Sequence, residues 1–266
     1  MLFAVDIDGT IAESEKGHSS LIRYMNRELG IGLSEERLAT FRAYHRGVSP
    51  EIQRDMEASQ QERETWQAYF ARFTFEGSPE VQHWLAQSPE HQARYAEVKQ
   101  ASQHDPGLQA AKIPILGAVE AMQQLARVGR LIYVSLRKPV SLALTRDWLA
   151  RYGFPSWEQA FCCGESCHLK YMRAYEHAET GERVTLIDDY AREMMRCFRI
   201  LGQVDLSVAR SLLPRLSFVA YGNIPVDPIP SKLERFPVAR IPAWNSEQFC
   251  SWYKEVSHEL VKPPLW

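Results

Sequence analysis

The sequence predicts an α/β protein with a doubly wound parallel sheet at its core. In the carboxyl-terminal part of the chain, short apolar runs alternate with segments in which apolar residues recur at helical spacing, the pattern of strand-helix-strand crossovers. An apolar run at residues 2–5 adds one strand. Residues 19–103 differ, because their apolar residues have helical spacing without β-branched runs. We therefore expect a core of residues 1–15 and 110–266, interrupted by an all-helical domain of residues 16–109.

The expected strands are apolar runs bounded by turn residues, and several expected helices begin at a cap or end at glycine. The strands are residues 2–5, 131–135, 160–163, 184–187 and 216–221. The core helices are residues 117–128, 140–152, 169–178, 191–201 and 246–260. The helices of the interruption are residues 20–29, 34–44, 50–73 and 89–103, with serine-proline pairs as start signals at Pro50, Pro79 and Pro89. Asp105-Pro106-Gly107 is a turn signal between the two regions.

Composition and charge exclude several classes of partner. The chain has 266 residues, 45% of them hydrophobic, and a net charge of -2, so it has no basic field to hold a nucleic acid polymer. No apolar stretch approaches the ~20 residues of a membrane helix, and the amino terminus lacks the pattern of a signal peptide. The five cysteines show no disulfide spacing. We expect a cytoplasmic protein without a nucleic-acid or membrane partner.

Asp6, Asp8, Gly9 and Thr10 follow the first expected strand. Two carboxylates separated by one residue at a strand end can place a nucleophile and a proton donor over one substrate atom. Gly9 would let the backbone turn where a side chain would clash. The alternative is an ordinary strand-end turn, in which Asp and Gly are common.

A hydroxyl and several cations occupy comparable positions later in the chain. Ser135 ends an expected strand, where its hydroxyl can donate a hydrogen bond to a phosphoryl oxygen or simply cap a helix. Lys170, at an expected helix start, can neutralise a nucleophile and a phosphoryl group. Arg137 and Lys138 compete for that role, and a solvated lysine is the ordinary alternative.

Asp188 and Asp189 follow the strand expected at residues 184–187. Functional groups at parallel strand ends gather at one edge of the sheet, so these acids should lie near Asp6 and Asp8. Burying that much negative charge is costly without a cation, and magnesium requires hard oxygen ligands. The pattern therefore predicts a Mg²⁺ site at this edge.

In order and spacing, these four groups resemble the four motifs of the haloacid dehalogenase superfamily. Asp6 to Thr10 matches the family's aspartate-x-aspartate-glycine-threonine motif without departure. Ser135, Lys170 and the acidic pair are similar to the second, third and fourth motifs, although the lysine-proline pair common in the third motif is absent at Lys170. The resemblance covers the whole core. It implies a Rossmann-like fold with a helical cap inserted between the first two motifs.

The same resemblance implies a magnesium-dependent phosphatase that acts on a small phosphorylated metabolite through an aspartyl-phosphate on Asp6. Asp8 would protonate the leaving oxygen and then activate water, and this second aspartate separates the family's phosphatases from its dehalogenases. The implied phosphoryl contacts are Gly9, Thr10, Ser135, Leu136, Arg137 and Lys170. The implied metal ligands are Asp6, the backbone carbonyl of Asp8, Asp188 and Asp189, of which Asp189 is favoured over Asp188 as a direct ligand.

Two other functions stay open on the sequence. The family's sugar phosphomutases share these motifs. A binding protein could keep the fold without catalysis, although no nucleophile, acid or metal ligand is missing.

Three further segments have weaker interpretations. Cys162, Cys163 and Cys167 lack a second ligand pair for zinc, so buried free thiols are expected. In the expected cap, which would close over the site and exclude water, an aromatic cluster is interpreted as helix core. Four basic residues are candidate substrate contacts, although a solvated helix face is favoured for Arg42, His45 and Arg46. The cluster is Trp66, Tyr69, Phe70, Phe73 and Phe75, and the basic residues are His18, Arg42, His45 and Arg46. The proline-rich stretch at residues 225–242 has no assigned role.

Overall fold

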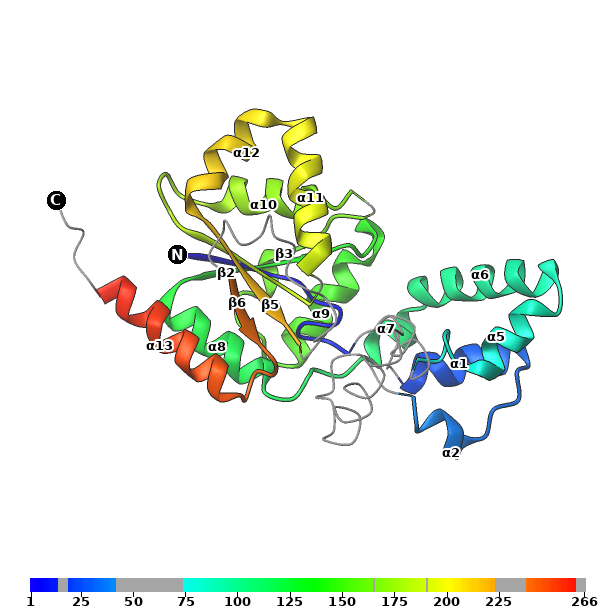
Figure 1. The fold of residues 1–266 in the computed structure, drawn as a ribbon. Helices are drawn as coiled ribbons and strands as arrows, with labels where there is room; N and C mark the ends of the chain where they lie inside the picture. Colours follow the sequence, from blue (N-terminus) through cyan, green and yellow to red (C-terminus); the bar gives the residue numbers. More distant parts are fainter. Residues whose placement is uncertain (14–18, 42–73, 165, 190, 223–237, 262–266) are drawn as a thin grey trace, which may run out of the picture. The chain divides into compact units, whose positions relative to one another are not determined.

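The computed structural model describes residues 1–13, 19–41, 74–164, 166–189, 191–222 and 238–261 (Figure 1). The chain forms two compact units, one of Met1–Ile11 with Pro114–Trp266 and the other of Ala12–Ile113. Each unit has a hydrophobic core cluster of its own. Within the described residues, no helix has both the length and the apolar character needed to cross a membrane.

The first unit is built on six parallel strands in the order β3-β2-β1-β4-β5-β6. They are β1 (Leu2–Val5), β2 (Arg130–Ser135), β3 (Ala160–Cys162), β4 (Val184–Asp188), β5 (Leu216–Tyr221) and β6 (Val238–Ile241). The chain adds strands on one side of β1 and then on the other, so the switch point of the topology lies between β1 and β4. The predicted fold class, a doubly wound α/β sheet, is confirmed.

Helices cover both faces of this sheet. Alternate residues of each strand point to opposite faces, so each strand contributes side chains to both helical layers. Leu2 and Ala4 pack into an apolar cluster with α10, α11 and α12, whereas Phe3 packs edge-on against Trp252 of α13 on the other face. Asp6 continues the alternation of Leu2 and Ala4 and therefore faces α10. The helices are α8 (Ala118–Val128), α9 (Leu142–Arg151), α10 (Leu169–His177), α11 (Ala191–Val204), α12 (Leu206–Leu212) and α13 (Glu247–Val261), with the 3-10 turns η1 (Pro139–Ser141), η2 (Trp157–Gln159) and η3 (Leu213–Arg215).

The second unit is helical over its described residues. Its helices are α1 (Ser19–Leu29), α2 (Glu35–Leu38), α5 (Pro79–Ala86), α6 (Pro89–His104) and α7 (Pro106–Ala110). α1 and α5 pack on α6 around a buried cluster that includes Ile22, Val81 and Val98. Ser78 and Ser88 cap α5 and α6 with their side-chain oxygens, as their serine-proline pairs predicted.

Some elements differ from the sequence-based expectation. The helix expected from residue 34 becomes α2, which ends at Leu38, where the Thr40 hydroxyl donates to the Arg37 carbonyl at 2.7 Å. The turn expected at Asp105 instead starts α7, because the Asp105 carboxylate accepts a hydrogen bond from the Leu108 amide at 2.8 Å. The short elements α12 and β6 were not predicted.

Part of the expected cap lies outside the described residues. This holds for the helix expected at residues 50–73 and for the candidates His18, Arg42, His45, Arg46, Trp66, Tyr69, Phe70 and Phe73. Phe75 is described, and it is buried in the core of the second unit, where it packs edge-on against Phe41. Its interpretation as core is therefore confirmed.

Candidate active site

The turn that follows β1 is fixed by its own backbone and by a neighbouring carboxylate. The amides of Thr10 and Ile11 donate to the Ile7 carbonyl at 3.3 and 3.0 Å. Gly9 has a φ of +89°, and a Cβ built on it would lie 2.4 Å from Asp189 Oδ2. Glycine is therefore required both by the left-handed backbone and by the close approach of the carboxylate.

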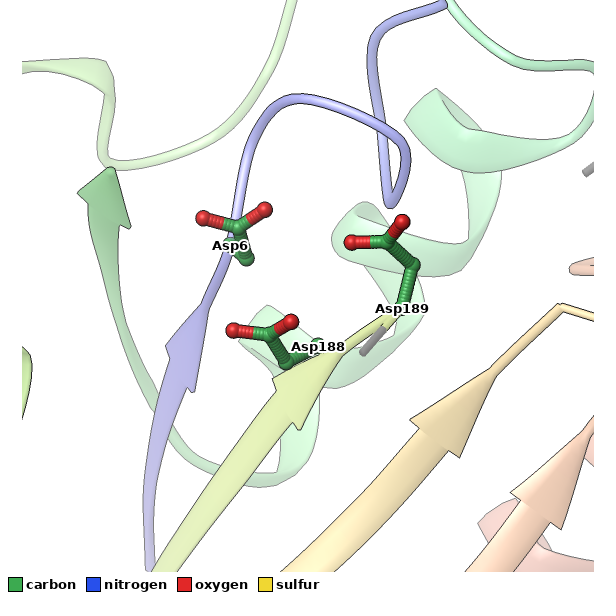
Figure 2. Close-up of side chains that lie close together, drawn as sticks. All are labelled: Asp6, Asp188 and Asp189. Atoms are coloured by element: carbon green, nitrogen blue, oxygen red, sulfur yellow. The ribbon is translucent and has the colours of Figure 1, made fainter. Parts of the chain in front are cut away.

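Three carboxylates gather at the switch point of the sheet, as Figure 2 shows. Oxygens of Asp6, Asp188 and Asp189 all lie within 4.8 Å of one another. Asp6 follows β1 and Asp188 ends β4, and the register that pairs Val5 with Ile187 brings the two acids together. Asp6 and Asp188 are buried, whereas Asp189 is half-buried. Within the described residues, this is the one group of acidic, histidine and cysteine side chains arranged to hold a metal ion.

Lys170 places an ammonium group between two of these carboxylates. It lies in α10 with 4% of its surface exposed, and its Nζ donates to Asp6 Oδ1 at 2.7 Å and to Asp188 Oδ2 at 2.8 Å. Burial alone would lower the pKa of Lys170, but the charges of Asp188 and Asp6 outweigh it and raise that pKa above its ordinary value. Lys170 therefore stays charged in this pocket.

For Asp6, burial has a larger effect on the pKa than the neighbouring cation. Burial raises the pKa of Asp6 well above its ordinary value, Lys170 opposes this effect, and the charges of Asp188 and Asp189 add to it. The buried ammonium bonds two of the three carboxylates, and the charges of Asp188 and Asp189 repel the ionised form of Asp6. A further cation would relieve this repulsion.

Asp8, the second acid of the first motif, is paired with a different cation. Arg137 donates from Nε and Nη2 to both carboxylate oxygens of Asp8, each at 2.7 Å. The same guanidinium donates from Nη1 to Thr145 Oγ1 at 3.1 Å, which fixes it to α9. Lys170 therefore bonds Asp6, whereas Arg137 bonds Asp8. On the sequence these two residues competed for the role of the cation beside the nucleophile, and in the structure they have separate partners. Lys138, the third competitor, precedes η1 and is half-buried.

The other residues expected to contact a phosphoryl group differ in their accessibility to it. Ser135 ends β2, and its buried Oγ accepts a hydrogen bond from the Arg137 amide at 3.2 Å, which leaves its hydroxyl proton for another acceptor. The Leu136 side chain is half-buried and packs against the apolar cluster that includes residues of α10. Thr10 Oγ1 is buried, and none of the described residues forms a hydrogen bond with it.

The cysteine-rich loop carries free thiols. Cys163 and Cys167 are buried, and Cys162 is half-buried with its Sγ 3.7 Å from Thr145 Oγ1. Burial raises the pKa of Cys163 to about 11, so its thiol is protonated at neutral pH. The expectation of buried free thiols is confirmed for Cys163 and Cys167.

Sequence reasoning missed three residues that support this site. Thr145 anchors Arg137, and Trp244 Nε1 donates to the Thr10 carbonyl at 2.7 Å. Tyr221, at the end of β5, stacks on Trp244. Trp244 is separated from Thr10 by 234 positions, and no local pattern marks such a contact.

The four motif positions meet at the carboxyl ends of the strands, in the order that the sequence resemblance requires. The structure thus brings together the residues on which the sequence resemblance rests. No protein-family model matches its sequence, and no curated protein matches it.

Several solved structures with haloacid dehalogenase names are similar over most of the chain. A hydrolase of this superfamily from Deinococcus radiodurans R1, crystallised with bound phosphate and sodium, is 16% identical, covers 98% of this chain and 97% of its own, and has a TM-score of 0.46. A haloacid dehalogenase-like hydrolase from Burkholderia xenovorans LB400 is 16% identical over 98% of each chain, with a TM-score of 0.44. A superfamily hydrolase of subfamily IA from Geobacter sulfurreducens PCA is 14% identical over 95% of each chain, with a TM-score of 0.47.

Proposed function

We propose that this protein is a magnesium-dependent phosphatase that hydrolyses a small phosphate monoester through an aspartyl-phosphate. One observation carries this proposal: the Asp6 carboxylate stands at the switch point of the sheet, bonded by the Lys170 ammonium at 2.7 Å and flanked by Asp188 and Asp189. A buried carboxylate with an adjacent fixed cation and two further acids is suited to covalent phosphoryl transfer, in which charge stabilisation and positioning dominate.

The acidic group fits a magnesium ion by charge and by ligand type. Three carboxylates gather around an ammonium that bonds Asp6 and Asp188, and the absence of a Cβ at Gly9 leaves the space that Asp189 occupies. Asp6, Asp189 and the backbone carbonyl of Asp8 would hold the ion, with Asp188 in support through its bond to Lys170. The ion would supply positive charge to the phosphoryl oxygens.

In the first step, Asp6 forms a bond to phosphorus while the bond to the ester oxygen breaks. Asp8 gives its proton to that leaving oxygen, which requires the bidentate pair with Arg137 to open. Lys170 keeps Asp6 oriented and, with the Ser135 hydroxyl, binds the phosphoryl oxygens.

In the second step, a water attacks phosphorus and the acyl-phosphate bond breaks, which releases inorganic phosphate and restores Asp6. Asp8 takes the proton of this water, and the carboxylate form paired with Arg137 is the form that can do so. Arg137, tied to Thr145, therefore orients Asp8 for the hydrolytic half of the reaction.

We propose a small phosphorylated metabolite as the substrate class, as the sequence resemblance implies. We also propose a cytoplasmic location, which is where such metabolites are found.

The deciding experiment is phosphate release from sugar phosphates, nucleoside monophosphates and small phospho-acids, with Mg²⁺ and with a chelator. We expect Mg²⁺-dependent release by the wild type and none by Asp6→Asn, which removes the nucleophile but keeps its shape. Trapping of a ³²P-labelled protein that is absent in Asp6→Asn would identify the intermediate. An isomerised product without free phosphate would instead indicate a phosphomutase, and no turnover by a folded, Mg²⁺-binding protein would indicate a binding function.

A further inference from the structure

Trp244 lies just after β6, in a part of the chain to which the proposed reaction assigns no role. β6 pairs in parallel with β5, with Ile241 beside Tyr221, and the Gly222 amide donates to the Ile241 carbonyl at 2.8 Å. This pairing brings Trp244 back over the carboxyl edge of the sheet. Its indole Nε1 donates to the Thr10 carbonyl at 2.7 Å.

The direction of this indole is fixed on several sides. Its ring stacks on Tyr221 with 4.6 Å between centroids and meets the edge of Phe249 at 5.5 Å. A Cβ built on Gly117 would lie 3.4 Å from the Trp244 Cβ, so the α8 start is also close. The residue is 2% exposed. A buried indole N-H with no access to water requires a protein acceptor, and the Thr10 carbonyl provides it.

The accepting carbonyl belongs to the turn that carries the first motif. The turn's own amide bonds from Thr10 and Ile11 both end on the Ile7 carbonyl, so they do not involve the Thr10 carbonyl. The indole bond is therefore an external tie on this turn. Gly9, directly before Thr10, lies against Asp189, and a small shift of this segment would change the space left for that carboxylate.

Tyr221 supports the indole from the end of β5. It is 2% exposed, and its ring stacks on Trp244. The strand end of β5 therefore helps to hold the indole in the orientation that bonds the Thr10 carbonyl.

We propose that Trp244 is a positioning residue, which holds the backbone of the first-motif turn at Thr10 and thereby sets the geometry of Gly9 against Asp189 for cation binding. The inference rests on the proposed function for its link to metal, but the tie on the turn can be measured without it. Residues 238–244 would then serve the active site, although they lie far from it in sequence.

The test compares Trp244→Phe with Trp252→Phe. Phenylalanine at 244 keeps an aromatic ring against Tyr221 but removes the N-H donor. Trp252 is the matched control. It lies on α13 and packs edge-on against Phe3 of β1, so Trp252→Phe removes the same atoms at a position away from the turn. Hydrogen-deuterium exchange of the Thr10 and Ile11 amides in metal-free protein reports opening of the turn directly. Calorimetric Mg²⁺ titration reports its effect on the cation site.

We expect amide exchange in the turn of Trp244→Phe to be about tenfold faster and Mg²⁺ affinity to be about tenfold weaker, with the turn exchange of Trp252→Phe and its Mg²⁺ affinity like those of the wild type. Equal exchange at the turn in both variants would overturn the inference. If the wild type neither binds Mg²⁺ nor releases phosphate, but turn exchange is still faster in Trp244→Phe, the indole does hold the turn and the proposed function is wrong. If Trp244→Phe does not fold, the isosteric analogue β-(3-benzothienyl)alanine at position 244 removes the N-H while filling the same volume.

Discussion

At the residue scale, Gly9 is constrained by two separate features that substitution can tell apart. Its φ of +89° disfavours any side chain, and its position would bring a Cβ to 2.4 Å from Asp189 Oδ2. Gly153 has a similar φ of +76°, but no atom of the described part of the chain lies within 4 Å of a Cβ built on it. The two glycines therefore share backbone strain and differ in the neighbouring carboxylate.

We predict that Gly9→Ala and Gly153→Ala each lose about 1 kcal/mol of stability from left-handed strain, and that only Gly9→Ala also loses Mg²⁺ affinity. The loss should be at least about tenfold, because Asp189 has to move. Urea unfolding measures the first effect and isothermal titration calorimetry the second. Equal Mg²⁺ affinities in the two variants would show that Asp189 has no part in the cation site.

The bonds of Lys170 to Asp6 and Asp188 lead to a second prediction. Lys170→Ala removes the cation from two buried carboxylates, so we expect kcat for phosphate release to fall by about two to three orders of magnitude. Lys138→Ala removes a lysine that precedes η1 and should stay within a few-fold of the wild type. Steady-state kinetics with a monoester substrate decides this. A few-fold effect of Lys170→Ala, together with a large effect of Lys138→Ala, would reassign the role.

Residues at strand ends were predictable, and long-range tethers were not. Asp6, Asp188 and Asp189 follow apolar runs, and the parallel sheet brings such positions to one edge. The pairing of Arg137 with Asp8 spans 129 positions and depends on how the loop after β2 folds, which no local pattern determines. The bond from Trp244 to Thr10 is of the same kind.

At the element scale, the strands with continuous apolar runs were predicted within a residue or so, because burial on both faces leaves a strong signal. β6 was missed because it is an edge strand of four residues, of which two are half-buried and one, Arg240, is exposed. α12 was missed although Asp205 caps it through bonds to the amides of Ser207 and Val208. Its seven residues are too few for a helical period to stand out.

An ion pair at the amino ends of β2 and β4 gives a prediction of pH dependence. Burial raises the pKa of Glu182, but hydrogen bonds from the Arg130 side chain, the Glu179 amide and the amino-terminal ammonium outweigh it and lower that pKa below its ordinary value. A lowered pKa contributes stability above the unfolded-state value of about 4.3, and this contribution is lost as pH falls through the folded-state value.

Glu182→Gln should therefore reduce the free energy of unfolding by about 1 kcal/mol at pH 7, and the difference from the wild type should shrink as pH falls below about 4. Glu179→Gln is the control, because its side chain is 76% exposed, 3.7 Å from the same arginine, and should change little. Urea unfolding across this pH range measures both variants. A difference that is constant with pH would mean that the ionised form of Glu182 is not what stabilises the fold.

At the scale of the whole molecule, the two units are separately organised. The apolar cluster between the sheet and α10, α11 and α12 belongs to the first unit, and the cluster around Ile22 and Val81 belongs to the second. Every side chain of the candidate site, from Asp6 to Trp244, lies in the first unit. Folding and cation binding should therefore be properties of the first unit.

Removal of the second unit from the chain tests this, because the two points where it joins the first unit lie close together. The Ile115 amide donates to the Ile11 carbonyl at 2.9 Å, so a linker of about four Gly and Ser residues can replace residues 12–113 without distorting either end. We predict that the shortened chain unfolds in one cooperative transition and that Mg²⁺ at about 100 times its Kd stabilises it by about 2.7 kcal/mol, as ligand binding to the folded state alone requires. Asp6→Asn in the same shortened chain should reduce this shift, which calorimetry can measure. A shortened chain that folds but shows no Mg²⁺-dependent shift, beside a full chain that does, would mean that the helical unit is needed to form the cation site.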